Sequence, residues 1–546
     1  MTRRPWCLVL ALASVACGGP TPQPPPSPAS VVPVVSIDAM RAHLRVLADD
    51  SLGGRAPATP GGRATTRYLA AQLAALGLEP AGPGGSYFQP VRLVGLMPRA
   101  TLAWGPAGRP RTLAFGDQFV AWAERPEETV SADGEVVFVG YGISAPEWRW
   151  DDYKGESLRG KILLMLVNDP GLQDSSVFLG RVLTYYGRWT YKIEEATRRG
   201  AVGVLMVHTT ESATYPWSVV RSSWTVEQFQ LDRRRPETLA AAGWVTEEAT
   251  RAALAERGLD LDTLTRAAAR REFRPVATGL RAAVTVTSAL RRVESENVVA
   301  RLPGRDSLLA RETVLLTAHW DHKGIGPAVA GDTIYNGAED NASGVAAMLG
   351  AAQALVAVRP RPRRTVLLVA TTAEESGLLG SAAYVDAPLV PLERTAVVLN
   401  LDVTNVRGRT RDISALGADR STVGAVFAAA ARAESLVVVE EPDVRGSFFR
   451  SDHFPFARAG VPALSFKAGL DFVGRPTGWG REQETLYNSR RYHQPSDQYD
   501  ESFDLTGMAQ QVRVVVRVAL AVAEAPEPPR WHPSSEFQRH GARAAP

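Results

Sequence analysis

The clearest pattern in the chain is a series of short, nearly uniform apolar runs separated by polar and glycine-rich segments. Four of these runs, at 313–317, 365–370, 396–401 and 462–466, are rich in β-branched residues. Such runs predict strands that are buried on both faces, as in a parallel sheet covered by helices. Apolar positions at helical spacing over 345–356 predict a helix between the first two strands. We therefore expect an α/β fold from Asn297 to Ala523.

Two earlier regions have patterns of their own. Residues 37–78 have apolar positions at helical spacing, with a glycine- and proline-rich break at 53–62, and 88–123 contains short alternating runs. From about Glu135 strands and a helix alternate again. The expected elements there are strands at 136–139, 161–167 and 202–207 and a helix at 193–200.

The N-terminus has the features of an export signal. Arg3 and Arg4 precede an apolar run, 6–16, that is too short to span a bilayer. Residues 14–18 resemble a bacterial lipobox, with Ser14 where leucine is usual, and Cys17 would be the lipid-modified residue. The Pro-rich segment 18–33 predicts an extended tether. We expect an exported lipoprotein anchored to a bacterial outer membrane or cell surface through Cys17; a plain cleaved secretory signal is the alternative.

Composition narrows the class of protein. The chain has 546 residues, 45% of them hydrophobic, which excludes wholesale disorder and predicts more than one domain. Lys and Arg total 61 against 58 Asp and Glu, so no charge excess favours nucleic acid as a partner. Only five of the basic residues are lysines, a skew that resembles genome composition. Cys7 and Cys17 are the only cysteines, which excludes a disulfide framework or cysteine nucleophile in the folded part.

Candidate metal ligands follow the predicted strands. Ligands bind at the carboxyl ends of strands in open α/β sheets, and acidic residues and histidines that converge there need a cation to offset their repulsion and burial. Two histidines and three carboxylates can hold two ions if one carboxylate bridges, which leaves one acid free as a base. Serine-hydrolase, zincin, phosphate-loop and dinucleotide motifs are missing from the sequence. The candidates are His319, Asp321, Asp340, Glu374, Glu375, Asp402 and His493.

These motifs together resemble the family-28 metallopeptidases, the group of bacterial co-catalytic zinc aminopeptidases. The matching segments occur in the family's order and cover the whole third region. The lead-in 52–55 and the middle region, which resembles a protease-associated insert, extend the likeness. The segments are 318–322, 340–344, 373–381, 400–402, 451–454, 460–462 and 492–493.

The resemblance implies a role for each candidate. His319 and Asp402 would hold one Zn²⁺, Glu375 and His493 the other, with Asp340 bridging. Glu374 would be the general base that takes a proton from the two-zinc-activated water, Asp321 would orient His319, and Tyr492 would assist the oxyanion. His322 and His453 would either contact the ligands without holding metal or be structural, and Asp452 and Asp497 would form hydrogen bonds within loops rather than bind metal. The segment 403–406 departs from the family pattern, which leaves the pocket's shape open.

The resemblance also implies an architecture. We expect a zinc-exopeptidase three-layer α/β/α sandwich with a mixed, mainly parallel sheet, plus an inserted β-rich protease-associated domain. The expected boundaries are 1–17 for the signal peptide, 18–33 for the tether, 34–130 for the N-terminal part of the peptidase domain, 131–285 for the insert, 286–525 for the catalytic domain and 526–546 for a flexible tail.

The implied function is a metal-dependent aminopeptidase that acts on peptides with a free N-terminus and carries two Zn²⁺ per chain. Manganese or cobalt could occupy the same ligands. Other zinc amidohydrolases on this fold, namely a carboxypeptidase, a dipeptidase or a glutaminyl-cyclase-like enzyme, are alternatives. So is a non-catalytic receptor, although such proteins usually lose metal ligands.

Overall fold

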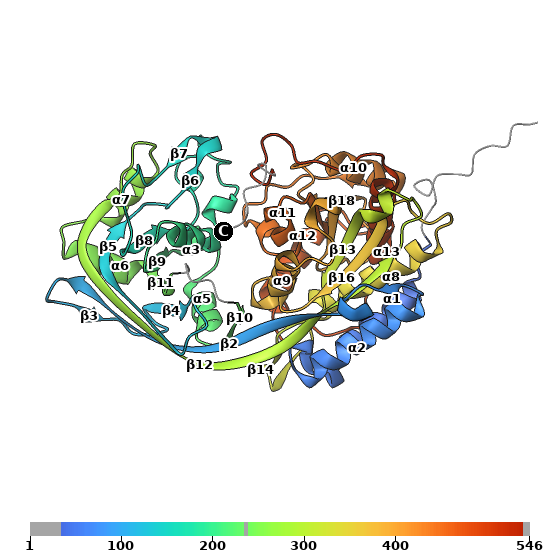
Figure 1. Ribbon diagram of the computed structural model, residues 1–546, viewed down its shortest axis with the longest axis horizontal. Coiled ribbons are helices and arrows are strands. Elements are labelled where there is room, and N and C mark those ends of the chain that lie inside the picture. Colours follow the sequence, from blue (N-terminus) through green and yellow to red (C-terminus); the bar gives the residue numbers. More distant parts are fainter. Residues whose placement is uncertain (1–33, 234–238, 539–546) are drawn as a thin grey trace, which may run out of the picture.

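The protein has two lobes joined by a long, curved pair of strands (Figure 1). In this computed structural model the structure describes residues 34–233 and 239–538. The antiparallel strands β2 (Phe88–Pro106) and β12 (Val276–Leu302) pair from Val298↔Phe88 to Leu280↔Pro106 and run through both lobes. A single sheet therefore continues from one lobe into the other.

The larger lobe is built on a mixed sheet in the order β19-β18-β20-β17-β13-β16-β12. The central strands β16, β13, β17 and β20 are parallel, while β12 and β18 run antiparallel to their neighbours β16 and β20. Every residue of β13, β16 and β17 is buried, as the uniform apolar runs predict. The bounds are β13 Thr313–His319, β16 Thr365–Thr371, β17 Thr395–Leu401, β18 Asp412–Leu416, β19 Val437–Val438 and β20 Ala463–Ala468.

Helices cover both faces of this sheet, which gives the expected three layers. Alternate residues of β13 separate the two cores, because Leu316 packs in one and Leu315 in the other. The first face is covered by α1 (Ile37–Leu47), α2 (Pro60–Ala75), α8 (Gly344–Ala357), α10 (Val423–Ala433) and α13 (Thr506–Glu524). The second carries α9 (Leu379–Asp386) and α11 (His453–Arg458), and α12 (Trp479–Arg490) lies before the His493 loop.

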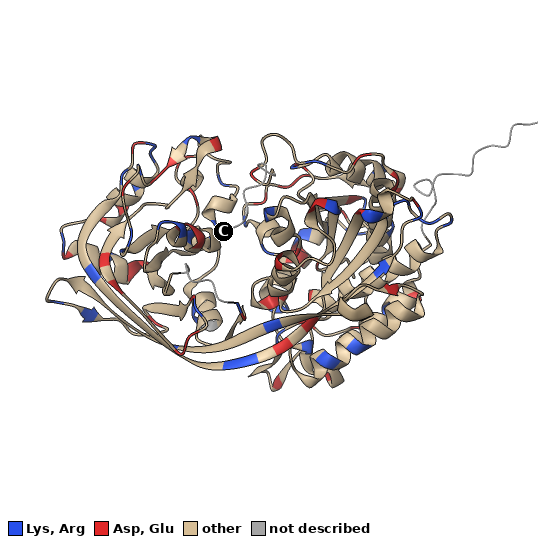
Figure 2. Cartoon of the chain, in the orientation of Figure 1, with Lys and Arg blue, Asp and Glu red and all other residues tan. Residues whose placement is uncertain are grey.

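The insert lobe contains four parallel strands flanked by helices. Strands β5 (Thr129–Phe138), β8 (Ile162–Leu166), β9 (Gly203–His208) and β11 (Ala241–Thr246) are adjacent in that order, and β4 (Phe119–Ala123) pairs antiparallel with β11. Two apolar clusters lie on the two faces of these strands. The helices are α3 Trp189–Arg198, α4 Thr210–Ala213, α5 Trp217–Trp224, α6 Glu247–Ala255 and α7 Leu261–Ala268. Figure 2 shows basic and acidic residues interspersed over both lobes.

The structure divides the chain differently from the expected boundaries. The expected division at 285/286 falls inside β12, and β4 belongs to the insert lobe although 34–130 was assigned to the peptidase domain. The expected flexible tail is packed over 526–538, since Trp531 and Phe537 are buried and Glu536 pairs with Arg420 at 2.7 Å. Apolar contacts with the second face of the sheet hold it there.

The expected signal peptide, Cys17 and tether lie outside the described residues, as do residues 539–546 of the tail. Among residues 34–233 and 239–538, none of the helices combines the length and the apolar character that a membrane span requires.

Candidate metal centre

The candidate site lies where three parallel strands end. β13 ends at His319, β17 is followed directly by Asp402, and β16 leads into the turn that carries Glu374 and Glu375. Because β13 is the central neighbour of β16 and β17, the three carboxyl ends meet at one edge of the sheet. Two loops from elsewhere in the chain complete the site, and they bring Asp340 and His493.

One group of ligand atoms surrounds the His319 ring. Its Nε2 atom lies 3.2 Å from Asp340 Oδ1 and 3.4 Å from Asp402 Oδ1. The ligand atoms of these three residues all lie within 4.8 Å of one another. His319 is buried, and its ring has the nitrogen and carboxylate neighbours that a divalent cation needs.

A second group surrounds His493. Its Nε2 atom lies 3.0 Å from Glu375 Oε2 and 3.3 Å from Asp340 Oδ2. Asp340 therefore gives one carboxylate oxygen to each histidine, which is the arrangement expected of a bridging ligand. Burial and Glu375 raise the pKa of Asp340, but its two histidine neighbours outweigh them and leave that pKa below its ordinary value.

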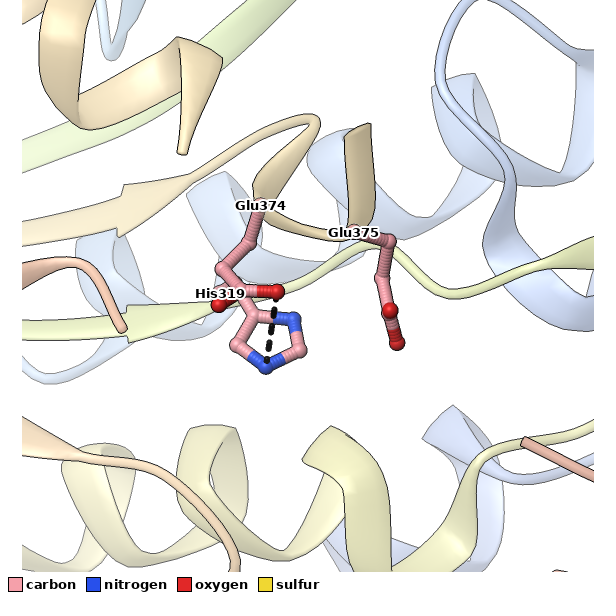
Figure 3. A group of neighbouring side chains, drawn as sticks. All are labelled: His319, Glu374 and Glu375. Carbon is pink, nitrogen blue, oxygen red and sulfur yellow. Dashed lines mark ion pairs between the residues drawn. The ribbon is translucent and has the colours of Figure 1, made fainter. Parts of the chain in front are cut away.

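Glu374 and Glu375 are adjacent in sequence but point to different places, as Figure 3 shows. Glu375 belongs to the His493 group, whereas one Glu374 oxygen lies 4.0 Å from His319 Nε2. Burial, together with Asp402 and Glu375, raises the pKa of Glu374 well above its ordinary value. The predicted division, with one glutamate as a ligand and the other beside the centre, fits this geometry.

Asp321 makes a different contact from the one expected. The His319 Nδ1 atom is hydrogen-bonded to the main-chain carbonyl of Asp321 at 3.1 Å, while the Asp321 carboxylate is 3.9 Å away. That carboxylate instead accepts a hydrogen bond from the Glu374 main-chain N–H at 3.1 Å. Since residue 321 follows residue 319 on an extended segment, the nearby carbonyl satisfies the ring and leaves the carboxylate to hold the glutamate turn.

Asp497 links the two loops that complete the site. Its carboxylate accepts hydrogen bonds from the main-chain N–H groups of Glu339 and Asp340, each at 3.1 Å. The Asp497 main-chain carbonyl accepts another from Ala338 at 2.9 Å. The prediction that this aspartate is a loop hydrogen-bonder rather than a ligand agrees with these contacts. Through them the His493 loop fixes the backbone of the bridging aspartate.

Three further side chains lie against the site. His322 was expected either to contact the ligands or to be structural, and its Nδ1 atom lies 2.6 Å from Glu375 Oε1. Lys323 Nζ lies 3.0 Å from Glu375 Oε2, and Lys467 Nζ lies 3.4 Å from the Asp402 carbonyl. The sequence analysis missed both lysines, although the rarity of lysine in the chain is a signal that could have identified them.

Tyr492, His453 and Asp452 differ in their exposure to solvent and in their contacts. The Tyr492 ring stacks on His493 with centroids 3.8 Å apart, and the residue as a whole is 43% exposed. His453 is fully buried against Phe448. Asp452 accepts hydrogen bonds from Ser381, at 2.5 Å, and from Thr371, which agrees with a structural role.

The donor set fits divalent cations. Within the described part of the chain, Asp321 Oδ2 is buried and has no hydrogen-bond partner, while His493 Nε2 and Glu375 Oε1 lie 3.0 and 2.6 Å from other ionisable side chains of the site. Buried polar atoms are usually paired, and acidic side chains packed this closely repel one another unless a cation lies between them. Nitrogen and carboxylate ligands suit zinc and also manganese or cobalt.

Comparison with known proteins agrees with the resemblance seen in the sequence. Residues 297–519 match the model of Peptidase family M28. Aminopeptidase YwaD of Bacillus subtilis is 31% identical over 193 residues, which are 34% of this chain and 36% of that protein. A vacuolar membrane protease of Yarrowia lipolytica is 30% identical over 116 residues, 21% of this chain and 11% of that protein. The chain thus spans only about a tenth of the length of the vacuolar relatives.

Solved structures with a similar arrangement include two bacterial aminopeptidases. One is an aminopeptidase from Aneurinibacillus sp. strain AM-1, with a TM-score of 0.46, 20% identity, and coverage of 90% of this chain and 95% of that chain. The other is BSAP, a zinc aminopeptidase from Bacillus subtilis, with a TM-score of 0.43, 19% identity, and coverage of 90% and 96%.

Proposed function

Because residues 297–519 form a domain of peptidase family M28, we propose that this protein is an aminopeptidase that uses two divalent cations to hydrolyse the first peptide bond of its substrates. One observation carries the proposal: Asp340 gives one oxygen to each of two histidines, and Glu374 stands beside them without belonging to the second group. We interpret this arrangement as a two-ion centre with a spare carboxylate.

The ligands divide between two ions. His319 and Asp402 would hold one, Glu375 and His493 the other, and Asp340 both. Zinc is the proposed metal, since the matched relatives include a zinc aminopeptidase by name and the donors are nitrogen and carboxylate. When bound, the ions supply Lewis acidity toward the scissile carbonyl and the attacking water, and stabilise the charge that develops.

Glu374 is the proposed general base. It accepts the proton of the attacking water and returns it to the leaving amine. The hydrogen bond from its main-chain N–H to Asp321 fixes the turn from which its side chain extends. Tyr492, whose ring stacks on His493, would donate its hydroxyl hydrogen to the substrate's developing oxyanion.

The location of the protein is also proposed. We infer export and membrane attachment through a lipid on Cys17, with 18–33 as the spacer between anchor and enzyme. Support comes from the N-terminal sequence and from relatives that are named as vacuolar membrane proteases.

The test uses the chain from Val34 onward with free and N-acetylated aminoacyl chromogenic amides, with and without chelator, and metals measured in the same sample. We expect chelator-sensitive cleavage of the free amines alone. Glu374→Gln should keep its metal and lose about 100- to 10,000-fold in kcat, the usual range for a general base. The exposed Glu393→Gln is the matched control.

Two results would contradict the proposal. Wild-type turnover by Glu374→Gln would exclude this glutamate as the base. Full metal loading without cleavage of any free amine would instead favour a carboxypeptidase, a dipeptidase or a cyclase on the same fold.

A further inference from the structure

Two of the five lysines of this chain touch the predicted metal ligands. Lysine is rare here, since arginine supplies 56 of the 61 basic residues, the remainder after the five lysines. Arginine presents a rigid planar fork, whereas lysine carries a compact charge on a flexible stem. Lys323 and Lys467 are therefore the candidates for binding a charged group of the substrate at this site.

Lys323 lies at the open side of the His493 group. It is one-third exposed, and its Nζ atom is 3.0 Å from Glu375 Oε2 and 3.4 Å from the Glu375 main-chain carbonyl. The same Oε2 atom lies 3.0 Å from His493 Nε2. A cation held by Glu375 and His493 would use this oxygen, so the ammonium group would need another anion.

Lys467 lies on the other side of the centre. It is in β20, which pairs with β17 through Leu401↔Phe466, so Lys467 stands next to Asp402 at the carboxyl edge of the sheet. Its Nζ atom donates to the Asp402 main-chain carbonyl at 3.4 Å and leaves the carboxylate to His319. The two ammonium groups thus flank the Glu375 and Asp402 ends of the site.

The charges at the centre show what these lysines would add. Asp340, Glu374, Glu375 and Asp402 carry four negative charges when ionised, and two divalent cations would balance them. Buried Asp321 lies near the buried guanidinium of Arg55, which offsets it. Lys323 and Lys467 would then add two positive charges beside the Glu375 and Asp402 ends of the centre, where they can attract an anionic group.

We propose that Lys323 and Lys467 bind a carboxylate of the substrate, so that the enzyme favours peptides that bring an acidic group to the metal centre. The inference rests on the proposed function, because it names the substrate class of the same site. Two carboxylates fit: the side chain of an acidic first residue and the C-terminal carboxylate of a dipeptide. Both are held by charge and hydrogen bonds from the ammonium groups.

Pairs of substrates that differ only in the carboxylate separate the two sources. Glutamyl and glutaminyl chromogenic amides test the side chain, while Leu-Leu and Leu-Leu-amide test the C-terminus. We expect kcat/KM to favour the charged member of at least one pair by about tenfold or more. The source is identified by which pair shows the ratio.

Variants assign the ratio to the lysines. Lys323→Met and Lys467→Met should each lower the kcat/KM ratio of the charged to the neutral substrate at least threefold. Lys323→Glu should reverse the charge preference, so that an arginyl amide is cleaved with a higher kcat/KM than the glutamyl amide. Lys161→Met is the matched control, since Lys161 is equally exposed but pairs with Glu135 in the insert lobe. Metal content is measured for every variant because Lys323 touches Glu375.

A binding measurement keeps this inference separate from the proposed function. Calorimetric titration of metal-loaded Glu374→Gln with free glutamate, free glutamine, Leu-Leu and Leu-Leu-amide needs no turnover. Tighter binding of a charged ligand that is lost in the Lys323→Met background supports the inference even if no amide is cleaved. Ratios near one in wild type, or ratios that both methionine variants leave unchanged, overturn it while the proposed aminopeptidase activity stands.

Discussion

Replacement of Arg55 by methionine should weaken the larger lobe and the metal centre together. Arg55 is 1% exposed, and its guanidinium donates to four main-chain carbonyls. Nε donates to the Trp320 carbonyl at 2.9 Å, and Nη2 donates to the Gly337 carbonyl at 2.9 Å. Nη1 donates to the carbonyl of Leu47 and to that of Asn336, the latter at 2.5 Å. One side chain thus connects the end of α1 to the segment that follows His319 and to the loop that carries Asp340.

The contacts set the size of the effect. A hydrogen bond with a charged donor contributes about 1.5–3 kcal/mol, and a buried carbonyl left without a partner costs about 1–3 kcal/mol. The four bonds share one guanidinium, so they do not add. Gly337 also accepts a bond from the Ala342 N–H at 3.1 Å, which survives the change. We expect Arg55→Met to lower the free energy of unfolding by about 3–5 kcal/mol, the range for loss of one partner from a buried charged network.

The metal centre should respond as well, because Trp320 lies between His319 and Asp321 and Gly337 precedes the Asp340 loop. Loss of groups that orient ligands typically weakens metal affinity about 10- to 100-fold. The assays are urea unfolding of the metal-free protein, followed by circular dichroism, and metal titration against a competing chelator.

Two further variants make the result interpretable. Arg55→Lys keeps the charge with fewer donors and should fall between wild type and Arg55→Met. The exposed Arg67→Met, on α2, should behave as wild type. The reasoning is refuted if Arg55→Met unfolds within about 1 kcal/mol of wild type and binds metal with unchanged affinity.

Three more outcomes are expected. Asp497→Asn should weaken metal binding about 10- to 100-fold in a chelator competition, since its carboxylate holds the Asp340 N–H; unchanged affinity would exclude that support. Burial raises the pKa of Glu124 to about 7 from 4.5, so the folded state binds this proton more tightly and stability should fall by about 2–3 kcal/mol as pH rises from 4.5 to 7. The stability of Glu124→Gln should lack this fall between pH 4.5 and 7, and a pH profile identical to that of wild type would contradict the role of Glu124. Phe537→Ala should cost about 3–5 kcal/mol in urea unfolding, because the ring is 4% exposed and packs near Tyr185 of the insert lobe; wild-type stability would show that the tail packs only loosely.

The strands of the larger lobe could be predicted because their burial leaves a simple mark on the sequence. Residues 366–370 are apolar at every position, and the structure places them inside β16 with both faces covered. The residues that follow such strands could likewise be selected as site candidates, since parallel strands end at one edge. Glu374 and Asp402 were found in this way.

Other features depend on contacts between distant segments. The bridging geometry of Asp340 needs the backbone bonds from Asp497, which is 157 residues away. No local pattern marks this pair; the ligand count allowed a bridge, and only the family resemblance assigned it to Asp340. At Asp321 the main-chain carbonyl contacts His319, and the carboxylate accepts a hydrogen bond from the turn that carries Glu374. Which oxygen makes which contact depends on atom positions that the sequence does not give.

The strand that joins the lobes was missed for a physical reason. β12 runs for 27 residues, but residues 291, 292 and 294 in its middle are charged and exposed, where the ribbon crosses between the two large cores. Only a small cluster around Val91 and Leu93 packs against this stretch, so the apolar alternation is weak there and periodicity gives little signal. Its strand structure comes from pairing with β2.

Where β12 enters the larger lobe, its side chains form hydrogen bonds with the turn that carries the proposed base. Asn297 accepts a hydrogen bond from the Thr372 N–H at 3.0 Å and donates one to the Gly380 carbonyl at 2.9 Å. Ser295 bonds the Thr372 hydroxyl at 2.7 Å. Residues 372 and 380 flank the turn that carries Glu374, so the end of the ribbon and the turn form one hydrogen-bonded unit. The insert lobe is therefore attached, through paired strands and buried polar contacts, to the edge of the sheet that carries the candidate ligands, and a displacement of the ribbon at Asn297 would also displace the turn that carries Glu374.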